Sequence, residues 1–267
     1  MGIMSRTVTL LTDFGLQDHY VGSMKGVMLT LNPEIHFVDI THQVPPHDLL
    51  TGAFMLGQAA ACFPPGTIHL AVVDPGVGTA RKALVAVAAA QFFVAPDNGL
   101  LSYVFNAVED YTVHEITAEH YFRKPVSSTF HGRDVFAPVA AWLSKEIPLR
   151  QFGPRLQNPV LLNIPVPVRV GETLMQATVL AVDVFGNLIT NLRPKDLPVF
   201  GGDARPCKVL AAQREIGSFR KTFAEGKPGE LFLVPGSSGY LEIVVREGSA
   251  AAELGLKSGA PIGVVMS

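Results

Sequence analysis

Short apolar runs alternate with longer helix-like segments over the first 160 residues of the chain. Strands are predicted at residues 7–12, 36–40 and 68–73, where β-branched and other apolar residues dominate. Helices are predicted at residues 20–31, 49–62 and 133–145. This alternation is typical of βαβ units, so residues 1–160 are expected to form an α/β domain with a mainly parallel sheet.

Start and stop signals mark the ends of two of these helices. Asn32 and Pro33 follow the first helix and are expected to end it. Asp48 stands where its carboxylate can cap the N-terminus of the second helix. The Pro-Pro-Gly sequence at residues 64–66 follows the second helix and is expected to stop it.

The pattern changes after about residue 150. Residues 157–159 (QNP) and 165–167 (PVP) are typical of a linker. Beyond them, the helical periodicity of apolar residues nearly vanishes. Short strands separated by Gly, Pro and Asn turns are predicted at residues 175–184, 188–192, 231–234, 240–245 and 262–266. A second, smaller domain is therefore expected over residues 161–267, with the pattern of a small barrel or a sandwich.

The composition narrows the classes of partner and the compartment. Of the 267 residues 48% are apolar, which is enough for a sizeable core. The 21 Lys and Arg against 23 Asp and Glu leave no basic surface of the kind that binds phosphate backbones, so no nucleic-acid partner is expected. Cys62 and Cys207 lack the spacing of a disulfide framework or a thiolate zinc site, which favours a reducing, cytoplasmic location.

No membrane partner is expected either. Residues 1–12 have no charged segment followed by a long apolar run and a cleavage site, as a signal peptide has. Arg6 stands where the Gly2 myristoylation pattern needs Ser or Thr. The most apolar stretch, residues 83–96, is interrupted by Gln91 and is shorter than the about 20 residues that span a bilayer.

Polar, glycine-containing clusters follow several strand-like segments, at residues 12–15 (TDFG), 74–78 (DPGVG), 96–99 (PDNG) and 129–134 (TFHGRD). Open α/β sheets bind ligands where their strands end, although Asp-Gly and Asn-Gly pairs also make ordinary turns. Asp13 can accept hydrogen bonds from vicinal ribose hydroxyls or form an Asx-turn. The sequence GVG at residues 76–78 lacks the third glycine of a dinucleotide fingerprint, which disfavours pyrophosphate binding.

Histidines provide further candidates. His131 precedes a predicted helix, where backbone N–H groups and the positive end of the helix dipole meet a polar side chain, and where a structural histidine is also common. His42, His47 and Asp48 combine ligand types that metals use, but their spacing matches no established metal motif. The sequences HGRD and GSSG fail the patterns of a kinase catalytic loop and of a serine hydrolase.

Taken in order, these motifs resemble the SAM hydroxide adenosyltransferase family, which is related to fluorinase and chlorinase. The resemblance rests on residues 10–15 (LLTDFG), 73–78 (VDPGVG) with Arg81, 95–99 (APDNG), 129–134 (TFHGRD), 183–191 (DVFGNLITN) and 236–242 (GSSGYLE). It implies a Rossmann-like N-terminal α/β domain, a C-terminal β-barrel domain, and a homotrimer whose active sites lie between subunits.

The resemblance also implies a chemistry. The family's catalytic triad of Asp, Arg and His corresponds to Asp74, Arg81 and His131. The halogenases have tyrosine at the position of Asp74, and fluorinase has a halide-binding serine at the position of Gly132. The implied activity is therefore hydrolysis of S-adenosyl-L-methionine (SAM), in which water attacks the ribose C5′ carbon and releases adenosine and L-methionine without a cofactor or metal.

The same resemblance distributes roles over a substrate site. It assigns Asp13 to the ribose hydroxyls, Asp183 to the methionine ammonium group, Ser237 and Ser238 to the methionine carboxylate, and Asn187 to adenine. Further pocket residues implied by it are Asp18, Thr129, Phe130, Gly132, Val245 and Glu247. His47 stands where fluorinase has a tryptophan over the ribose, so its role stays open.

Three other functions remain as alternatives. A noncatalytic SAM- or adenosine-binding module would use the same pocket with an idle triad. A halide-dependent adenosyl transferase would form a halogenated nucleoside. Asp74 and Gly132 disfavour this alternative, because they replace residues that the halogenases have at these positions. A metal-dependent hydrolase would depend on His42, His47 and Asp48.

Overall fold

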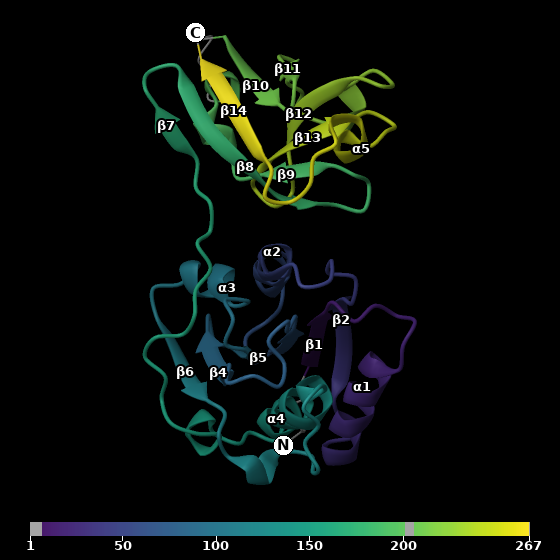
Figure 1. Ribbon diagram of the computed structural model, residues 1–267, viewed down its shortest axis with the longest axis vertical. Helices are drawn as coiled ribbons and strands as arrows, with labels where there is room; N and C mark the ends of the chain where they lie inside the picture. Colours follow the sequence, from purple (N-terminus) through teal and green to yellow (C-terminus); the bar gives the residue numbers. More distant parts are fainter. Residues whose placement is uncertain (1–6, 201–205, 267) are drawn as a thin grey trace. The chain divides into compact units, whose positions relative to one another are not determined.

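A computed structural model describes residues 7–200 and 206–266. The chain divides into two compact units, Met1–Asn163 and Ile164–Ser267 (Figure 1). Each unit has its own sheet and its own hydrophobic core.

The first unit contains a 6-stranded sheet in the order β2-β1-β3-β5-β4-β6. Its strands are β1 (Thr7–Thr12), β2 (His36–Thr41), β3 (Ile68–Val72), β4 (Ala83–Ala88), β5 (Gln91–Pro96) and β6 (Tyr111–Glu115). β2, β1, β3 and β5 are parallel neighbours, whereas β4 is antiparallel to both β5 and β6. The expected α/β fold with a mainly parallel sheet is confirmed.

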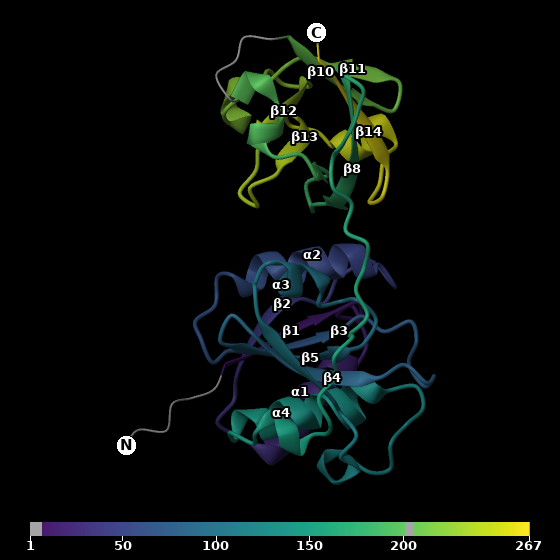
Figure 2. The same cartoon turned by 90° about the vertical axis from the view of Figure 1, so that its left-hand side faces the viewer.

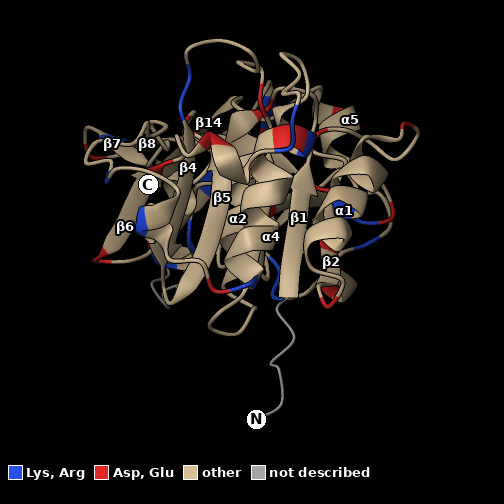
Figure 3. Ribbon diagram, turned by 90° about the horizontal axis from the view of Figure 1, so that it is seen from below, with Lys and Arg blue, Asp and Glu red and all other residues tan. Residues whose placement is uncertain are grey.

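Helices cover both faces of this sheet. α1 (Tyr20–Leu31) and α4 (Ala137–Ser144) lie over one face, and α2 (Leu49–Ala60) and α3 (Ser102–Asn106) over the other (Figures 2 and 3). Successive side chains of β1 pack against the helices on opposite faces of the sheet, because side chains alternate along a strand. Leu10 belongs to the core that contains Met24 of α1, and Leu11 to the core that contains Leu56 of α2.

Two of the predicted helices differ in detail from their prediction. Asp48 caps α2 as expected, accepting a hydrogen bond from the Thr51 amide, but the helix ends at Ala60. The third begins with a π-helical turn at Gly132–Phe136 before α4. Pro138 has no N–H to donate to the Asp134 carbonyl, which instead accepts from the Arg123 amide at 2.9 Å.

The apolar run at residues 83–96 forms the β-hairpin of β4 and β5. Its two turn residues, Ala89 and Ala90, have φ angles of 49° and 58°. Such a turn normally contains Asn or Gly, because these residues tolerate positive φ. The turn therefore carries no sequence signal, which is why neither strand was predicted.

The second unit is a nearly closed, mainly antiparallel barrel, in the order β11-β10-β14-β8-β9-β13-β12, with β7 paired to β8. Its elements are β7 (Val168–Val170), β8 (Leu174–Val182), β9 (Leu188–Thr190), β10 (Cys207–Ala211), β11 (Arg214–Ile216), β12 (Leu231–Pro235), β13 (Leu241–Val245), α5 (Ala250–Leu254) and β14 (Pro261–Met266). A bridge between Phe219 and Leu233 brings the segment after β11 to β12 and helps close the sheet. The barrel, rather than the sandwich, is confirmed.

Short helical turns complete the chain. They are Glu119–Tyr121, Leu149–Gln151, Pro194–Asp196, Pro198–Phe200 and Phe223–Glu225. Within the described residues, no helix is long and apolar enough to cross a membrane. Cys62 and Cys207 are free thiols, the first exposed and the second buried.

Candidate active site

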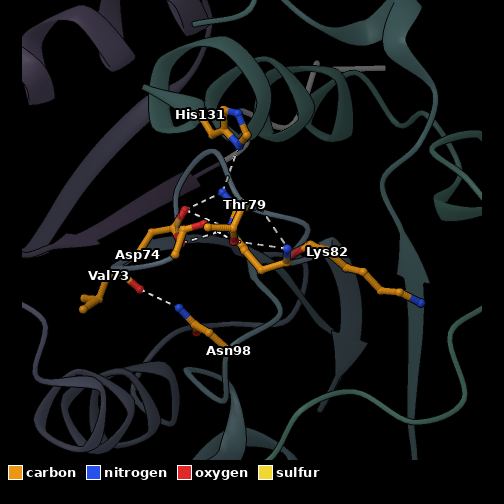
Figure 4. Close-up of polar contacts among 8 residues, drawn as sticks. Val73, Asp74, Thr79, Lys82, Asn98 and His131 are labelled. Atoms are coloured by element: carbon orange, nitrogen blue, oxygen red, sulfur yellow. Dashed lines mark hydrogen bonds and ion pairs between the residues drawn. The ribbon is translucent and has the colours of Figure 1, made fainter. Parts of the chain in front are cut away.

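Asp74, Arg81 and His131 meet at one end of the first unit's sheet (Figure 4). Asp74 follows β3, Arg81 precedes β4, and His131 precedes the π-helical turn. The Arg81 Nε donates to Asp74 Oδ1 at 2.9 Å and to Oδ2 at 3.0 Å, and its Nη2 also contacts Asp74 Oδ2. Nη2 donates to His131 Nδ1 at 2.9 Å as well. One guanidinium therefore connects the other two residues.

The protonation state of His131 follows from this contact. Arginine stays protonated in proteins, so Arg81 is the donor and His131 Nδ1 must be an unprotonated acceptor. Burial, and then the positive charge of Arg81, lower the pKa of His131 below its usual value. A neutral His131 in this position carries its proton on Nε2.

The loop between Asp74 and Arg81 is built from tight turns. The Gly76 carbonyl accepts from the Thr79 amide and hydroxyl, at 3.1 Å and 2.7 Å. Gly78 has a φ of 78°, and a side chain there would collide with the Ser128 carbonyl. Asn98, from the PDNG cluster, donates to the Val73 carbonyl at 2.8 Å (Figure 4). Three of the predicted clusters thus support one another at this end of the sheet.

Asp134 is a buried carboxylate near His131 that sequence reasoning did not select. It is 0% exposed and accepts hydrogen bonds from Arg133, from Arg123 and from the Ser127 amide. Burial raises its pKa, but the hydrogen bonds from these partners outweigh burial and lower it overall. Through Arg123 and Ser127, Asp134 links the segment before His131 to the helical turn that follows it. Its position in the TFHGRD motif is the sequence feature that could have identified Asp134.

Asp13 lies in a loop that is held by buried polar contacts. Its Oδ2 accepts a hydrogen bond from the His47 amide at 3.0 Å. The preceding Thr12 hydroxyl contacts His42 Nδ1 at 2.9 Å, while His42 Nε2 lies 3.1 Å from an Asp39 oxygen. Asp18, farther along the same loop, is exposed.

The alternative metal ligands are engaged in this local structure. His42 contacts Thr12 and Asp39, and Asp48 caps α2 through Thr51. In residues 7–200 and 206–266, no group of three or more His, Cys, Asp or Glu side chains is placed to hold a metal ion. His42, His47 and Asp48 therefore do not make up such a group in this part of the chain.

The neighbours of His131 in the TFHGRD motif differ in exposure. Thr129 is exposed, whereas Phe130 is buried in an aromatic group with Phe14 and Tyr20. A Cβ atom at Gly132 would lie 3.3 Å from both the Met24 sulfur and the Phe130 ring. Gly132 is therefore closely packed, with little room for a side chain.

The predicted residues of the second unit gather around a pocket of about 740 Å³. Asp183, Asn187, Ser237, Val245 and Glu247 all line it. Pockets of roughly 300–1,000 Å³ are typical of small-molecule sites. This unit therefore contains a ligand-sized pocket formed by residues that the resemblance assigns to substrate.

Asp183 organises one wall of this pocket. Its Oδ1 accepts from the Phe185 amide at 2.9 Å and from the Asn187 amide at 2.8 Å, and its Oδ2 accepts from Asn187 Nδ2 at 2.8 Å. The Ser238 hydroxyl is not among the lining groups, but it is buried and has no hydrogen-bond partner within the described residues. Glu242, which was not predicted as a site residue, does line the pocket.

Comparisons with known proteins identify the family of this chain. Residues 8–153 match the SAM hydroxide adenosyltransferase N-terminal domain, and residues 177–263 match the C-terminal domain. The chain is 40% identical over 255 residues to a Salinispora tropica protein named (R)-S-adenosyl-L-methionine hydrolase, covering 94% of this chain and 95% of that protein. A fluorinase from Nocardia brasiliensis is more distant, at 27% identity over 290 residues and 96% of each chain.

A solved structure has the same fold. The crystal structure of an uncharacterized conserved protein from Thermotoga maritima matches with a TM-score of 0.89 and 39% sequence identity. The match covers 97% of this chain and 99% of that one. The chain therefore belongs to the SAM hydroxide adenosyltransferase family.

Proposed function

We propose that this protein is a SAM hydrolase in which water attacks the ribose C5′ carbon and releases adenosine and L-methionine. The observation that carries the proposal is the Arg81 guanidinium that holds Asp74 and His131 together. Further support comes from a 40% identical relative that is named (R)-S-adenosyl-L-methionine hydrolase. We extend that name to this chain and propose the R configuration at the substrate sulfonium.

The reaction needs little beyond a well-placed water molecule. When the C5′–S bond breaks, its electron pair neutralises the sulfonium, so methionine leaves as a neutral thioether without a general acid. The remaining requirement is to hold water in line with that bond and accept its proton. Neither step requires a cofactor.

The triad supplies these two functions. Neutral His131 carries a proton on Nε2 and can donate it in a hydrogen bond to the water oxygen. In this tautomer His131 has no free lone pair for the proton of water, so the carboxylate of Asp74 is the acceptor. Arg81 orients both groups and stabilises the developing hydroxide character.

The substrate site is proposed from the residues that the resemblance assigns to it. Asp13 binds the ribose hydroxyls, Asp183 the ammonium group, and Asn187 the adenine. The other proposed binding residues are Asp18, Thr129, Phe130, Gly132, Ser237, Ser238, Val245 and Glu247. The functional domains are proposed as residues 1–160 and 161–267. We also propose a cytoplasmic homotrimer whose active sites are completed between subunits.

Product analysis with the separate sulfonium epimers tests this function. Purified protein is incubated with each epimer in the presence of EDTA, with and without chloride, and nucleosides are separated by liquid chromatography. Adenosine formed from the R epimer, unaffected by EDTA, is the expected result. Intact substrate retained by the protein would instead indicate a binding module, and 5′-chloro-5′-deoxyadenosine a halogenase.

A further inference from the structure

Glu242 is a buried carboxylate that the fold leaves without a hydrogen-bond donor. It lies in β13 and is 7% exposed. Among the residues that the structure describes, no backbone or side-chain group donates a hydrogen bond to it. Buried carboxylates are normally paired, since burying an unpaired charge costs several kcal/mol. Within the described residues, the Glu242 carboxylate therefore has no protein partner for its charge, and it belongs to the lining of the pocket.

The surroundings of Glu242 do not favour its charge. The residues directly opposite it are Val234 in β12 and Ile189 in β9, both apolar. Burial, and then the negative charge of Asp183, raise the pKa of the Glu242 carboxyl. A group that destabilises the free protein in this way is typical of a functional site.

Glu242 lines the 740 Å³ pocket together with Asp183, Asn187 and Ser237. Its position depends on Gly236, where a side chain would collide with the Glu242 carboxylate. The backbone of Gly236 is itself fixed, because its amide donates to the Tyr240 carbonyl at 2.8 Å. The GSSGYLE segment thus leaves a space that the carboxylate occupies.

The charges in this pocket favour a cationic hydrogen-bond donor. Three hydrogen bonds from residues 185 and 187 already hold Asp183. Glu242 has its acceptor sites free, and the two negative charges repel each other. A primary ammonium group has three N–H donors and one positive charge, so it can hydrogen-bond both carboxylates at once. A sulfonium centre is positive but has no proton to donate.

We propose that Glu242 is a substrate-binding residue that, together with Asp183, binds the α-ammonium group of the amino-acid half of the substrate. Because this assignment rests on the function proposed above, it adds a specificity determinant to that site. Substrates that lack the amino group cannot make these hydrogen bonds and are expected to bind more weakly. The reaction itself takes place at C5′, so Glu242 affects binding rather than the chemical step.

The test compares Glu242→Gln with the unaltered protein on two substrates. One is SAM, and the other is its desamino analogue, S-adenosyl-4-methylthiobutyrate. Losing a charge-assisted hydrogen bond corresponds to about a 10- to 100-fold loss of affinity. KM for SAM is expected to rise by that factor with kcat nearly unchanged, whereas KM for the analogue stays the same. Glu215→Gln, an exposed carboxylate of β11, is the matched control.

Stability separates this role from a structural one. With its raised pKa, an ionised Glu242 destabilises the folded state at neutral pH, so the melting temperature of ligand-free Glu242→Gln should equal or exceed that of the parent protein. A clear drop in melting temperature would mean that Glu242 supports the fold instead. Equal KM changes for both substrates, or none for either, would also overturn the proposal.

Calorimetric binding of SAM keeps the proposal testable if the protein proves not to hydrolyse it. In that case the proposed function fails, but the 10- to 100-fold loss of SAM affinity in Glu242→Gln is still expected. Equal affinity of the two proteins, or no SAM binding by the parent protein, would refute the role of Glu242.

Discussion

Arg81 is the residue on which the geometry of the triad depends. Its guanidinium contacts Asp74 through two nitrogens and His131 through one of them, and it lies 5.1 Å from the centre of the Phe136 ring. Lysine could not reproduce this arrangement, because its ammonium group is a compact charge rather than a planar fork. The same contact sets the tautomer of His131, and in the proposed reaction it leaves Asp74 as the proton acceptor.

Replacing Asp74 by asparagine tests this assignment. The variant keeps an oxygen that can accept from Arg81 but loses the base, so kcat should fall about 10²- to 10⁴-fold with a much smaller change in KM. Steady-state kinetics on the purified variant measures both constants. Asp110→Asn, which alters an exposed carboxylate, serves as the control. Unchanged turnover in Asp74→Asn would remove Asp74 from the chemistry.

The members of the triad could not have been grouped by spacing. Asp74 and His131 are far apart in the chain and meet only because β3 and the turn before α4 end near each other. Residue-level reasoning offered each as one candidate among several, and the family resemblance selected them. Glu242 was not selected, because only the fold shows that this carboxylate is buried and has no hydrogen-bond donor among the described residues.

At the scale of elements, the loop between β3 and β4 determines where Arg81 lies. Gly78 of this loop closely approaches the Ser128 carbonyl in the segment before His131. Both its positive φ and this close approach require glycine. The second glycine of the DPGVG sequence is thus explained by packing between two loops.

Gly78→Ala should therefore impair folding and activity together. Backbone strain at positive φ and the collision with Ser128 should lower the free energy of unfolding by about 1–3 kcal/mol and reduce kcat as the His131 loop shifts. Gly171→Ala is the matched control, because Gly171 has a φ of 72° but no atom within 4 Å of the position that a Cβ would take. Denaturant titration measures the stability of both variants. Equal stability losses would show that the loop contact is unimportant.

His69 in β3 is expected to make the first unit sensitive to acid. It is 0% exposed, contacts the Thr9 hydroxyl at 2.7 Å, and burial lowers its pKa to about 4. The unfolded chain binds a proton at an ordinary pKa of 6.5, so stability is lost as pH falls from 6.5 towards 4. His69 alone should contribute about 3 kcal/mol to this loss.

Comparison with His69→Gln isolates that contribution. Other groups titrate equally in both proteins, so the stability difference between them should shift by about 3 kcal/mol between pH 7 and pH 4. Urea titrations at several pH values measure it. Parallel curves for the two proteins would show that His69 takes up its proton equally well in the folded state.

Most helices and strands that a clear sequence pattern marks were predicted. The elements that were missed or differ in detail have local structural causes. β1 and α1 have the predicted limits, because a β-branched run and an Asn-Pro stop mark them. The β4–β5 hairpin was missed because Ala89 and Ala90 form its turn without Asn or Gly. The π-helical turn before α4 depends on Pro138 and a hydrogen bond to the distant Arg123, which periodicity does not reveal.

At the scale of the whole molecule, the two units carry different parts of the proposed chemistry. The first contains Asp74, Arg81 and His131, which suit the attack of water, and the second contains the pocket with Asp183 and Glu242. The change in sequence pattern after residue 150 predicted two units, and the fold of each is confirmed. The barrel could be distinguished from a sandwich only through the family resemblance, because short strands are common to both.

Hydrolysis in H₂¹⁸O tests the central claim most directly. The protein is incubated with SAM in labelled water, and adenosine and methionine are analysed by mass spectrometry. Attack of water at C5′ places ¹⁸O on the 5′ oxygen of adenosine and leaves methionine unlabelled. Adenosine without the label, or no adenosine at all, would contradict the proposed reaction.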